Sequence, residues 1–213
     1  LGQPNVAWRQ ISEARDKITA VELKGHRLYL RTHAGAPRSR VLALDLRAAI
    51  LARAEEVVAQ PDGGVLEGFQ LTRSGIVTEV REGTAIGLRR HAPGDRIGQK
   101  MALPFIGAAR LYADPAHGSD DVLYQLAGWP DLPRLYLLQG GRSVDAGLKR
   151  NAKLPAWPEL QVTEVKVPSH DGVAVPMTIL HKTGLPLDGR NPVLLDGYSA
   201  YGYSQTAHFS PAN

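Results

Sequence analysis

Residues 27–46 read RLYLRTHAGAPRSRVLALDL, and this stretch decides the fold class of the chain. On both sides of the segment HAGAP (33–37), leucines alternate with polar or smaller residues at a period of two. That period is typical of strands with a buried face, and glycine and proline between two such runs indicate a turn. The stretch therefore predicts an antiparallel hairpin.

The hairpin pattern returns further along the chain. Residues 76–80 and 85–89 flank a Glu-Gly turn, and residues 121–127 and 134–139 flank a proline-containing loop. Groups of antiparallel strands that recur every ~40 to 50 residues are what the blades of a β-propeller would produce. This part of the chain is therefore expected to be mainly β.

One segment in this part breaks the pattern. Apolar residues between Leu46 and Val58 recur at helical spacing, and the alanine, arginine and glutamate among them favour helix. We expect at most a short helix there, ending before the turn residues PDGG (61–64).

The composition is that of a globular chain and excludes several classes of protein. The 213 residues are 43% hydrophobic and 22% charged, which suits a chain that buries a core. Cysteine is absent, which excludes disulfides, thiolate metal sites and a cysteine nucleophile. The net charge is +4 and aromatic residues make up 6%, so we expect no nucleic-acid partner.

The sequence carries no membrane, metal or cofactor signal. No apolar run approaches the roughly 20 residues that a membrane-spanning helix needs, so we expect no membrane partner. The seven histidines do not have the spacing of a metal site, and no glycine-rich segment precedes a helical pattern, so we expect neither a metal nor a cofactor. The sequence does not decide between the cytoplasm and the periplasm, because its first residues show no recognisable targeting signal.

The sequence changes character at a proline-bounded connector, KLPAWP (153–158). We place a domain boundary near residue 160. Beyond it, residues 163–167 and 173–181 flank an Asp-Gly turn, which predicts a further hairpin.

An apolar run, PVLL (192–195), then leads into the hydroxyl-rich loop DGYSAYGY (196–203). The run predicts a strand covered on both faces, and α/β enzymes place functional groups where such a strand enters a glycine-bearing loop. Neither serine of this loop region lies in a nucleophile elbow, because Gly-x-Ser-x-Gly occurs nowhere in the chain.

The segments around this loop carry the most specific pattern in the chain. They are VKVPSHDG (165–172), LDGYSAYG (195–202) and FSP (209–211), in order and with matching spacing. They resemble the opening of the peptidase domain in the prolyl oligopeptidase family. More loosely, residues 28–46 and PRLY (133–136) resemble strands of that family's propeller.

The resemblance implies a fold as well as an activity. In that family a seven-bladed propeller caps an α/β-hydrolase domain. We therefore expect a mainly β chain: a partial β-propeller of the last two to three blades over residues 1–160, followed by the first strands of an α/β-hydrolase domain over residues 161–213.

The resemblance also implies roles for two tyrosines. Tyr198 matches the family's oxyanion-stabilising tyrosine, and Tyr201 matches an aromatic residue that walls the substrate pocket. A hydroxyl aimed at the carbonyl oxygen stabilises the negative charge that develops there during acyl transfer. The loop departs from the family pattern at Asp196, Ser199 and Ala200.

The family's nucleophilic serine, in a Gly-Gly-Ser-x-Gly-Gly segment, and its later Asp and His have no counterpart before Asn213. The resemblance thus implies part of a serine peptidase that hydrolyses short peptides by acyl-enzyme chemistry. We expect this chain to be inactive alone and to have the remainder of the peptidase domain as its partner. Two alternatives stay open: a non-catalytic propeller-type binding module, and a related oligopeptidase that cuts after basic residues.

Overall fold

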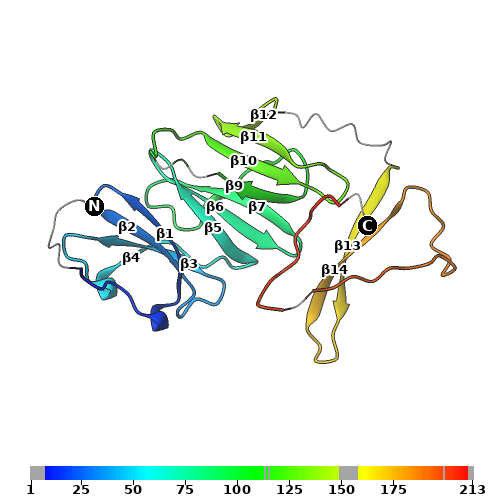
Figure 1. Cartoon of the computed structure of the whole chain (residues 1–213), viewed down its shortest axis with the longest axis horizontal. Coiled ribbons are helices and arrows are strands. Elements are labelled where there is room, and N and C mark those ends of the chain that lie inside the picture. The colour runs from blue at the N-terminus through cyan, green and yellow to red at the C-terminus, as the bar shows by residue number, and fades with distance from the viewer. Residues whose placement is uncertain (1–7, 113, 115, 149–157, 199, 211–213) are drawn as a thin grey trace. The chain divides into compact units, whose positions relative to one another are not determined.

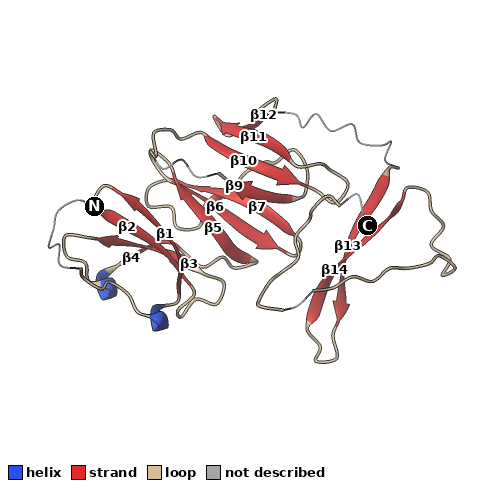
Figure 2. Cartoon of the chain, in the orientation of Figure 1, coloured by secondary structure: helices blue, strands red, loops and turns tan. Residues whose placement is uncertain are grey.

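The computed structural model describes residues 8–112, 114, 116–148, 158–198 and 200–210. Strands dominate these residues, with two short 3-10 helices, η1 (Ala14–Asp16) and η2 (Leu51–Arg53) (Figure 2). Within the described ranges, no helix is long and apolar enough to cross a membrane. The fold is mainly β, as the sequence predicts.

The first four strands form one sheet in chain order (Figure 1), namely β1 (Ile18–Lys24), β2 (Arg27–Thr32), β3 (Arg40–Asp45) and β4 (Glu55–Val58). β2 and β3 are the first predicted hairpin, with Leu30 opposite Leu42. β3 buries side chains on both faces, because Val41 and Ala43 alternate with the buried Leu44. This hairpin is confirmed, and β3 is covered on both faces.

The helical spacing between residues 46 and 58 is mostly misleading. Only Leu51–Arg53 form a helical turn, and the residues after it continue as β4, which pairs with β3 through Val58 and Val41. Val58 is 1% exposed and belongs to a hydrophobic cluster with residues of β5. Strand pairing and this burial outweigh the weak helix propensity of so short a segment.

The second sheet contains eight strands in the order β12-β11-β10-β9-β7-β6-β5, with β8 paired to β7. Its strands are β5 (Val65–Leu71), β6 (Ile76–Glu82), β7 (Ala85–His91), β8 (Gln99–Lys100), β9 (Ala108–Leu111), β10 (Val122–Ala127), β11 (Arg134–Gln139) and β12 (Arg142–Asp145). The predicted hairpins at 76–89 and 121–139 are confirmed as β6–β7 and β10–β11. Together with β1–β4, the groups β5–β8 and β9–β12 give three runs of four consecutive strands, which is the strand content of propeller blades.

The chain divides into two compact units that interleave along the sequence. The first contains Leu1–Val80, Arg89–Lys100 and Asp114–Asp120, and the second contains Arg81–Leu88, Met101–Ala113 and Asp121–Asn213. Each has its own core. The core of the first unit is formed by Val41, Val58, Leu66, Phe69, Leu71, Ile76 and Val80. That of the second includes the fully buried Val122, Tyr124, Leu126 and Leu138.

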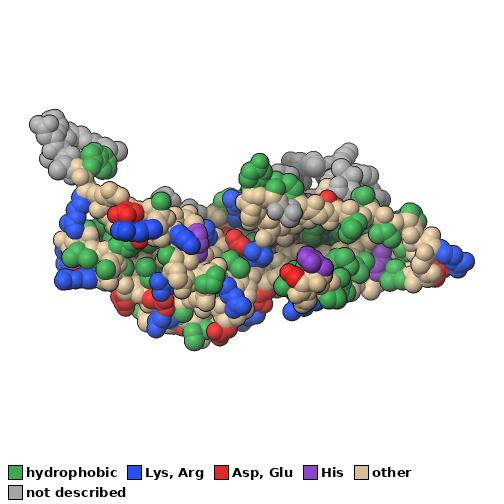
Figure 3. Space-filling model, turned by 90° about the horizontal axis from the view of Figure 1, so that it is seen from below, with side chains coloured by type: hydrophobic (Ala, Val, Ile, Leu, Met, Phe, Trp, Pro, Cys, Tyr) green, Lys and Arg blue, Asp and Glu red, His purple; other side chains and the backbone are tan. Residues whose placement is uncertain are grey.

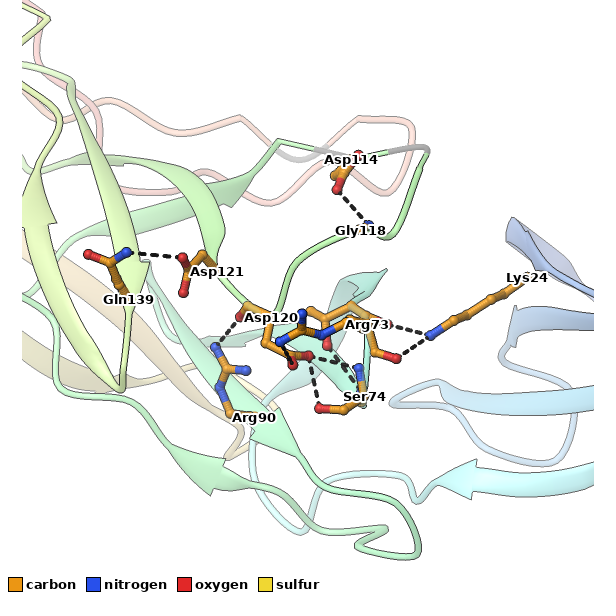
Figure 4. A network of polar contacts seen from close by, with 11 residues as sticks. Lys24, Arg73, Ser74, Arg90, Asp114, Gly118, Asp120, Asp121 and Gln139 are labelled. Atoms are coloured by element: carbon orange, nitrogen blue, oxygen red, sulfur yellow. Dashed lines mark hydrogen bonds and ion pairs between the residues drawn. The ribbon is translucent and has the colours of Figure 1, made fainter.

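Within the first unit, Asp120 holds the turn between β5 and β6 (Figure 4). Its Oδ1 accepts hydrogen bonds from the backbone N–H and the hydroxyl of Ser74, at 2.8 and 2.9 Å, and Arg73 lies 3.4 Å from Oδ2. Lys24 donates to the carbonyl oxygens of Thr72 and Arg73 in the same turn. The backbone hydrogen bond from Ser74 is the main cause that lowers the pKa of Asp120 to about 2.

Asp120→Asn is expected to lower the free energy of unfolding by about 1 to 2 kcal/mol at neutral pH, because charge-assisted hydrogen bonds to Ser74 become neutral ones. The folded pKa lies below the free value of 3.8, so this stabilisation is present above about pH 4 and is lost as the pH falls toward 2. Urea unfolding at neutral and acidic pH should therefore show a difference between variant and parent that shrinks with acidification. Asp62→Asn, at an exposed loop carboxylate, is the matched control; a difference that is the same at both pH values would contradict this role.

The last two strands, β13 (Leu160–Pro168) and β14 (Ala174–Lys182), form a separate antiparallel pair with Val167 opposite Val175. This confirms the hairpin predicted beyond residue 160. Many of its apolar side chains are exposed, including Val175 at 46%, and Figure 3 shows hydrophobic side chains on the surface in the right-hand half of the view.

The predicted strand at residues 192–195 is wrong. These residues form no strand, and Val193, Leu194 and Leu195 are all more than 80% exposed. A strand covered on both faces needs neighbouring strands, and the described residues place none beside this run. The α/β-hydrolase sheet and the domain boundary near residue 160 stay predictions, and most of the connector at 153–158 lies outside the described residues.

Candidate functional site

The two predicted site residues, Tyr198 and Tyr201, lie in one loop of the second unit. The side chain of Tyr198 is 52% exposed and that of Tyr201 is fully exposed. A surface hollow of about 540 Å³ belongs to the first unit, where Thr32 and Arg40 help to line it, and neither tyrosine contributes to it. The candidate site is therefore an open loop.

A tight turn at residues 200–203 shapes this loop. The backbone N–H of Tyr203 donates to the carbonyl oxygen of Ala200 at 3.1 Å, and φ is +56° at Tyr201 and +68° at Gly202. Positive φ at both central residues is the signature of a type I′ turn. Glycine adopts this conformation freely, whereas for a tyrosine it costs on the order of 1 kcal/mol. The turn thus presents the Tyr201 ring at its tip, in a conformation that is often found at functional positions.

Tyr198 meets Tyr203 rather than Tyr201. The ring centroids of Tyr198 and Tyr203 are 5.7 Å apart and the ring planes are inclined by 76°, an edge-to-face arrangement. The turn reverses the chain between these residues and so brings the two rings together. The structure therefore places both predicted tyrosines in one loop and adds a third, Tyr203, that sequence reasoning missed.

The chain after the turn is anchored within the second unit. The backbone N–H of Ala207 donates to the carbonyl oxygen of Thr84 at 2.8 Å, and Ala207 is only 4% exposed. The ring of His208 lies 5.2 Å from that of Trp129, in the loop between β10 and β11. These contacts fix the downstream end of the loop.

Thr84 links this anchor to the last hairpin. It lies in the turn between β6 and β7, and its hydroxyl donates to the carboxylate of Glu164 on β13 and lies 3.4 Å from the hydroxyl of Thr178 on β14. Glu164 follows Thr84 by 80 residues. The turn between β6 and β7 therefore holds both the β13–β14 hairpin and the segment around Ala207.

The run Ser169-His170-Asp171 contains the residue types of a catalytic triad, but the structure makes it a turn, as the sequence predicts. The backbone N–H of Gly172 donates to the carbonyl oxygen of Ser169 at 2.9 Å, and the Asp171 carboxylate accepts from the backbone N–H of Val173. This last bond lowers the pKa of Asp171. The carboxylate is thus engaged by the turn itself.

Chemically, the loop that carries Tyr198, Tyr201 and Tyr203 offers phenol hydroxyls, which are hydrogen-bond donors. In the part of the chain that the structure describes, no group of three or more His, Asp or Glu side chains could hold a metal ion. The arrangement offers exposed hydroxyls that can donate hydrogen bonds to a ligand and ring faces that can pack against an apolar group.

Comparison with known proteins gives the family context. No protein-family model matches the chain. Prolyl oligopeptidase A of Galerina marginata is 25% identical over 215 residues that cover 97% of this chain, and the prolyl endopeptidase of Elizabethkingia miricola is 23% identical over 95% of it. The sequence relatives of this chain are prolyl oligopeptidases.

Solved structures of such enzymes have the same fold. A prolyl endopeptidase structure, from work on inter-domain dynamics in catalysis and specificity, matches 90% of this chain with a TM-score of 0.76 at 25% identity. Prolyl oligopeptidase B of Galerina marginata, bound to a 35mer hydrolysis and macrocyclization substrate, matches 90% with a TM-score of 0.72 at 17% identity. The β-propeller fragment expected from the sequence is thereby confirmed.

The chain spans only part of these prolyl oligopeptidases. It covers 28% of the length of each of the two relatives, and 28% and 27% of the two solved chains. The resemblance seen in the sequence is confirmed, while the roles of Tyr198 and Tyr201 stay predictions. Tyr203 and Thr84 had no sequence signal, because their contacts depend on a turn and on a partner distant in sequence.

Proposed function

We propose that this chain is part of a serine peptidase that hydrolyses short peptides through an acyl-enzyme. The observation that carries the proposal is the match to a prolyl endopeptidase over 90% of the chain, with a TM-score of 0.76 and 25% identity. Prolyl oligopeptidases among the sequence relatives support the same family of reactions. The proposal extends the activity of those enzymes to the protein that contains this chain.

In this proposal the Tyr198 hydroxyl faces the carbonyl oxygen of the scissile bond. As the nucleophile attacks, that oxygen gains negative charge, and a preorganised donor stabilises it by roughly 3 kcal/mol. Tyr198 is half exposed on a loop, which leaves its hydroxyl accessible to a ligand. The nucleophile, Asp and His come from the remainder of the peptidase domain.

Tyr201 contacts the substrate side chain in the same proposal. Its ring stands free at the tip of the turn, so a flat apolar surface is available to a bound residue. The blades take no part in the chemistry and restrict access to short peptides. The exposed apolar residues 193–195 are covered by the remainder of the peptidase domain, since a surface run this apolar favours burial.

A fluorophosphonate probe, which labels activated serines, tests the proposal directly. The full-length gene product should be labelled and should cleave a short proline-containing peptide, whereas this chain alone should do neither. Serine labelling with cleavage after Lys or Arg would identify an oligopeptidase for basic residues. A full-length product that is folded but unlabelled would overturn the proposal in favour of a non-catalytic binding module.

A further inference from the structure

Tyr203 is the aromatic residue of the candidate loop that the sequence left without a role. Its ring lies edge-to-face with that of Tyr198, with centroids 5.7 Å apart and planes inclined by 76°. In this geometry the electropositive edge of one ring meets the electronegative face of the other, so the contact is directional. It therefore restrains how the Tyr198 ring is oriented, besides shielding apolar surface.

The backbone makes Tyr203 the better anchored of the two tyrosines. Its own N–H closes the turn by donating to Ala200, and four residues later Ala207 is buried and bonded to Thr84 at 2.8 Å. Tyr198, on the other side of the turn, follows a run of residues that are more than 80% exposed. The ring of Tyr203 can therefore restrain the orientation of the Tyr198 ring.

We propose that Tyr203 is a positioning residue that keeps the Tyr198 phenol oriented for oxyanion stabilisation. The inference rests on the function proposed above. A hydrogen-bond donor contributes to the transition state to the extent that it is already in place, because orienting it during the reaction costs entropy. The ring of Tyr203 keeps the Tyr198 phenol in place before the reaction, and the hydroxyl of Tyr203 does not contribute to this effect.

The test is a double-mutant cycle in the full-length protein, with kcat and KM measured separately on a short fluorogenic proline-containing peptide. Tyr203→Ala should lower kcat by about two- to tenfold, the range expected for the loss of one aromatic pair, with KM nearly unchanged. Tyr203→Phe keeps the ring and removes only the hydroxyl, so it is the matched control and should retain the parent kcat. In a Tyr198→Phe background, Tyr203→Ala should have no further effect.

Further measurements separate positioning from a general role in loop stability. Tyr203→Leu keeps apolar bulk without a ring and should behave like Tyr203→Ala, while thermal unfolding of both variants stays close to the parent. In protein labelled with fluorotyrosine, the Tyr198 resonance should shift in Tyr203→Ala and Tyr203→Leu, because the neighbouring ring is lost.

The outcomes separate this inference from the proposed function. An unchanged kcat in Tyr203→Ala, or an equal loss with and without the Tyr198 hydroxyl, would overturn the positioning role. If Tyr198→Phe itself leaves kcat unchanged while serine labelling persists, the role proposed for Tyr198 fails instead. An unshifted Tyr198 resonance in Tyr203→Ala would show that the ring contact is absent, whatever the kinetics.

Discussion

Tyr198→Phe should lower kcat of the full-length protein by about 10- to 1000-fold, because one oxyanion donor contributes roughly that factor to acyl transfer. The substitution removes the hydroxyl and keeps the ring that contacts Tyr203 at 5.7 Å, so the loop should keep its shape. KM should change little, since the bond strengthens only as charge develops on the carbonyl oxygen. Steady-state kinetics on a short peptide measures both constants.

Tyr203→Phe is the matched control for this experiment, because it removes a phenol hydroxyl five positions away in the same loop. Both variants should unfold at nearly the parent temperature, since the two side chains are 52% and 59% exposed. Equal kcat values for Tyr198→Phe and the parent would exclude Tyr198 from the chemistry and leave it as a surface aromatic residue.

Gly75→Ala should destabilise the first unit by about 2 to 3 kcal/mol, the upper range for forcing extra atoms into a packed site. A Cβ at residue 75 would lie 2.3 Å from the carbonyl oxygen of His91 on β7. The atoms that this Cβ would meet belong to the backbone of His91 and Ala92, so no flexible side chain can move aside. The residue also closes the turn after β5, where the N–H of Thr72 donates to its carbonyl oxygen at 2.9 Å, so a shift of Gly75 would strain that turn.

Gly87→Ala is the matched control, because a Cβ at residue 87 would meet no atom within 4 Å. Urea unfolding should show a lower midpoint for Gly75→Ala and a midpoint near the parent for Gly87→Ala. If the two variants unfold at the same midpoint, the backbone of His91 does not lie close enough to Gly75 to exclude a Cβ.

The sequence predicted the hairpins because their signals are local. In residues 27–46 the alternation and the turn between the strands lie within one short stretch, so the pairing of Leu30 with Leu42 needs no distant information. Strands β1, β5, β8, β9 and β12 were missed, because the identity of each as a strand depends on the neighbour it joins. The helical spacing before Val58 was overridden for the same reason, by pairing with Val41.

The candidate site was predictable only in part. Tyr198 and Tyr201 were selected by resemblance to a family, since neither stands in a catalytic motif that spacing alone would identify. The positive φ at Tyr201 could not be expected from the residue type, because tyrosine rarely adopts it. The run at 192–195 was read as a covered strand, yet apolar character alone does not specify whether partner strands are present.

If the protein is a peptidase as proposed, the turn at residues 200–203 has a consequence for engineering its substrate preference. Left-handed backbone at Gly202 is free of steric cost only for glycine, so diversity introduced there would distort the tip itself. Position 201 already tolerates a bulky side chain in that conformation, and asparagine or aspartate would adopt it more easily. A library confined to residue 201 should therefore vary the surface offered to peptides while the scaffold stays constant.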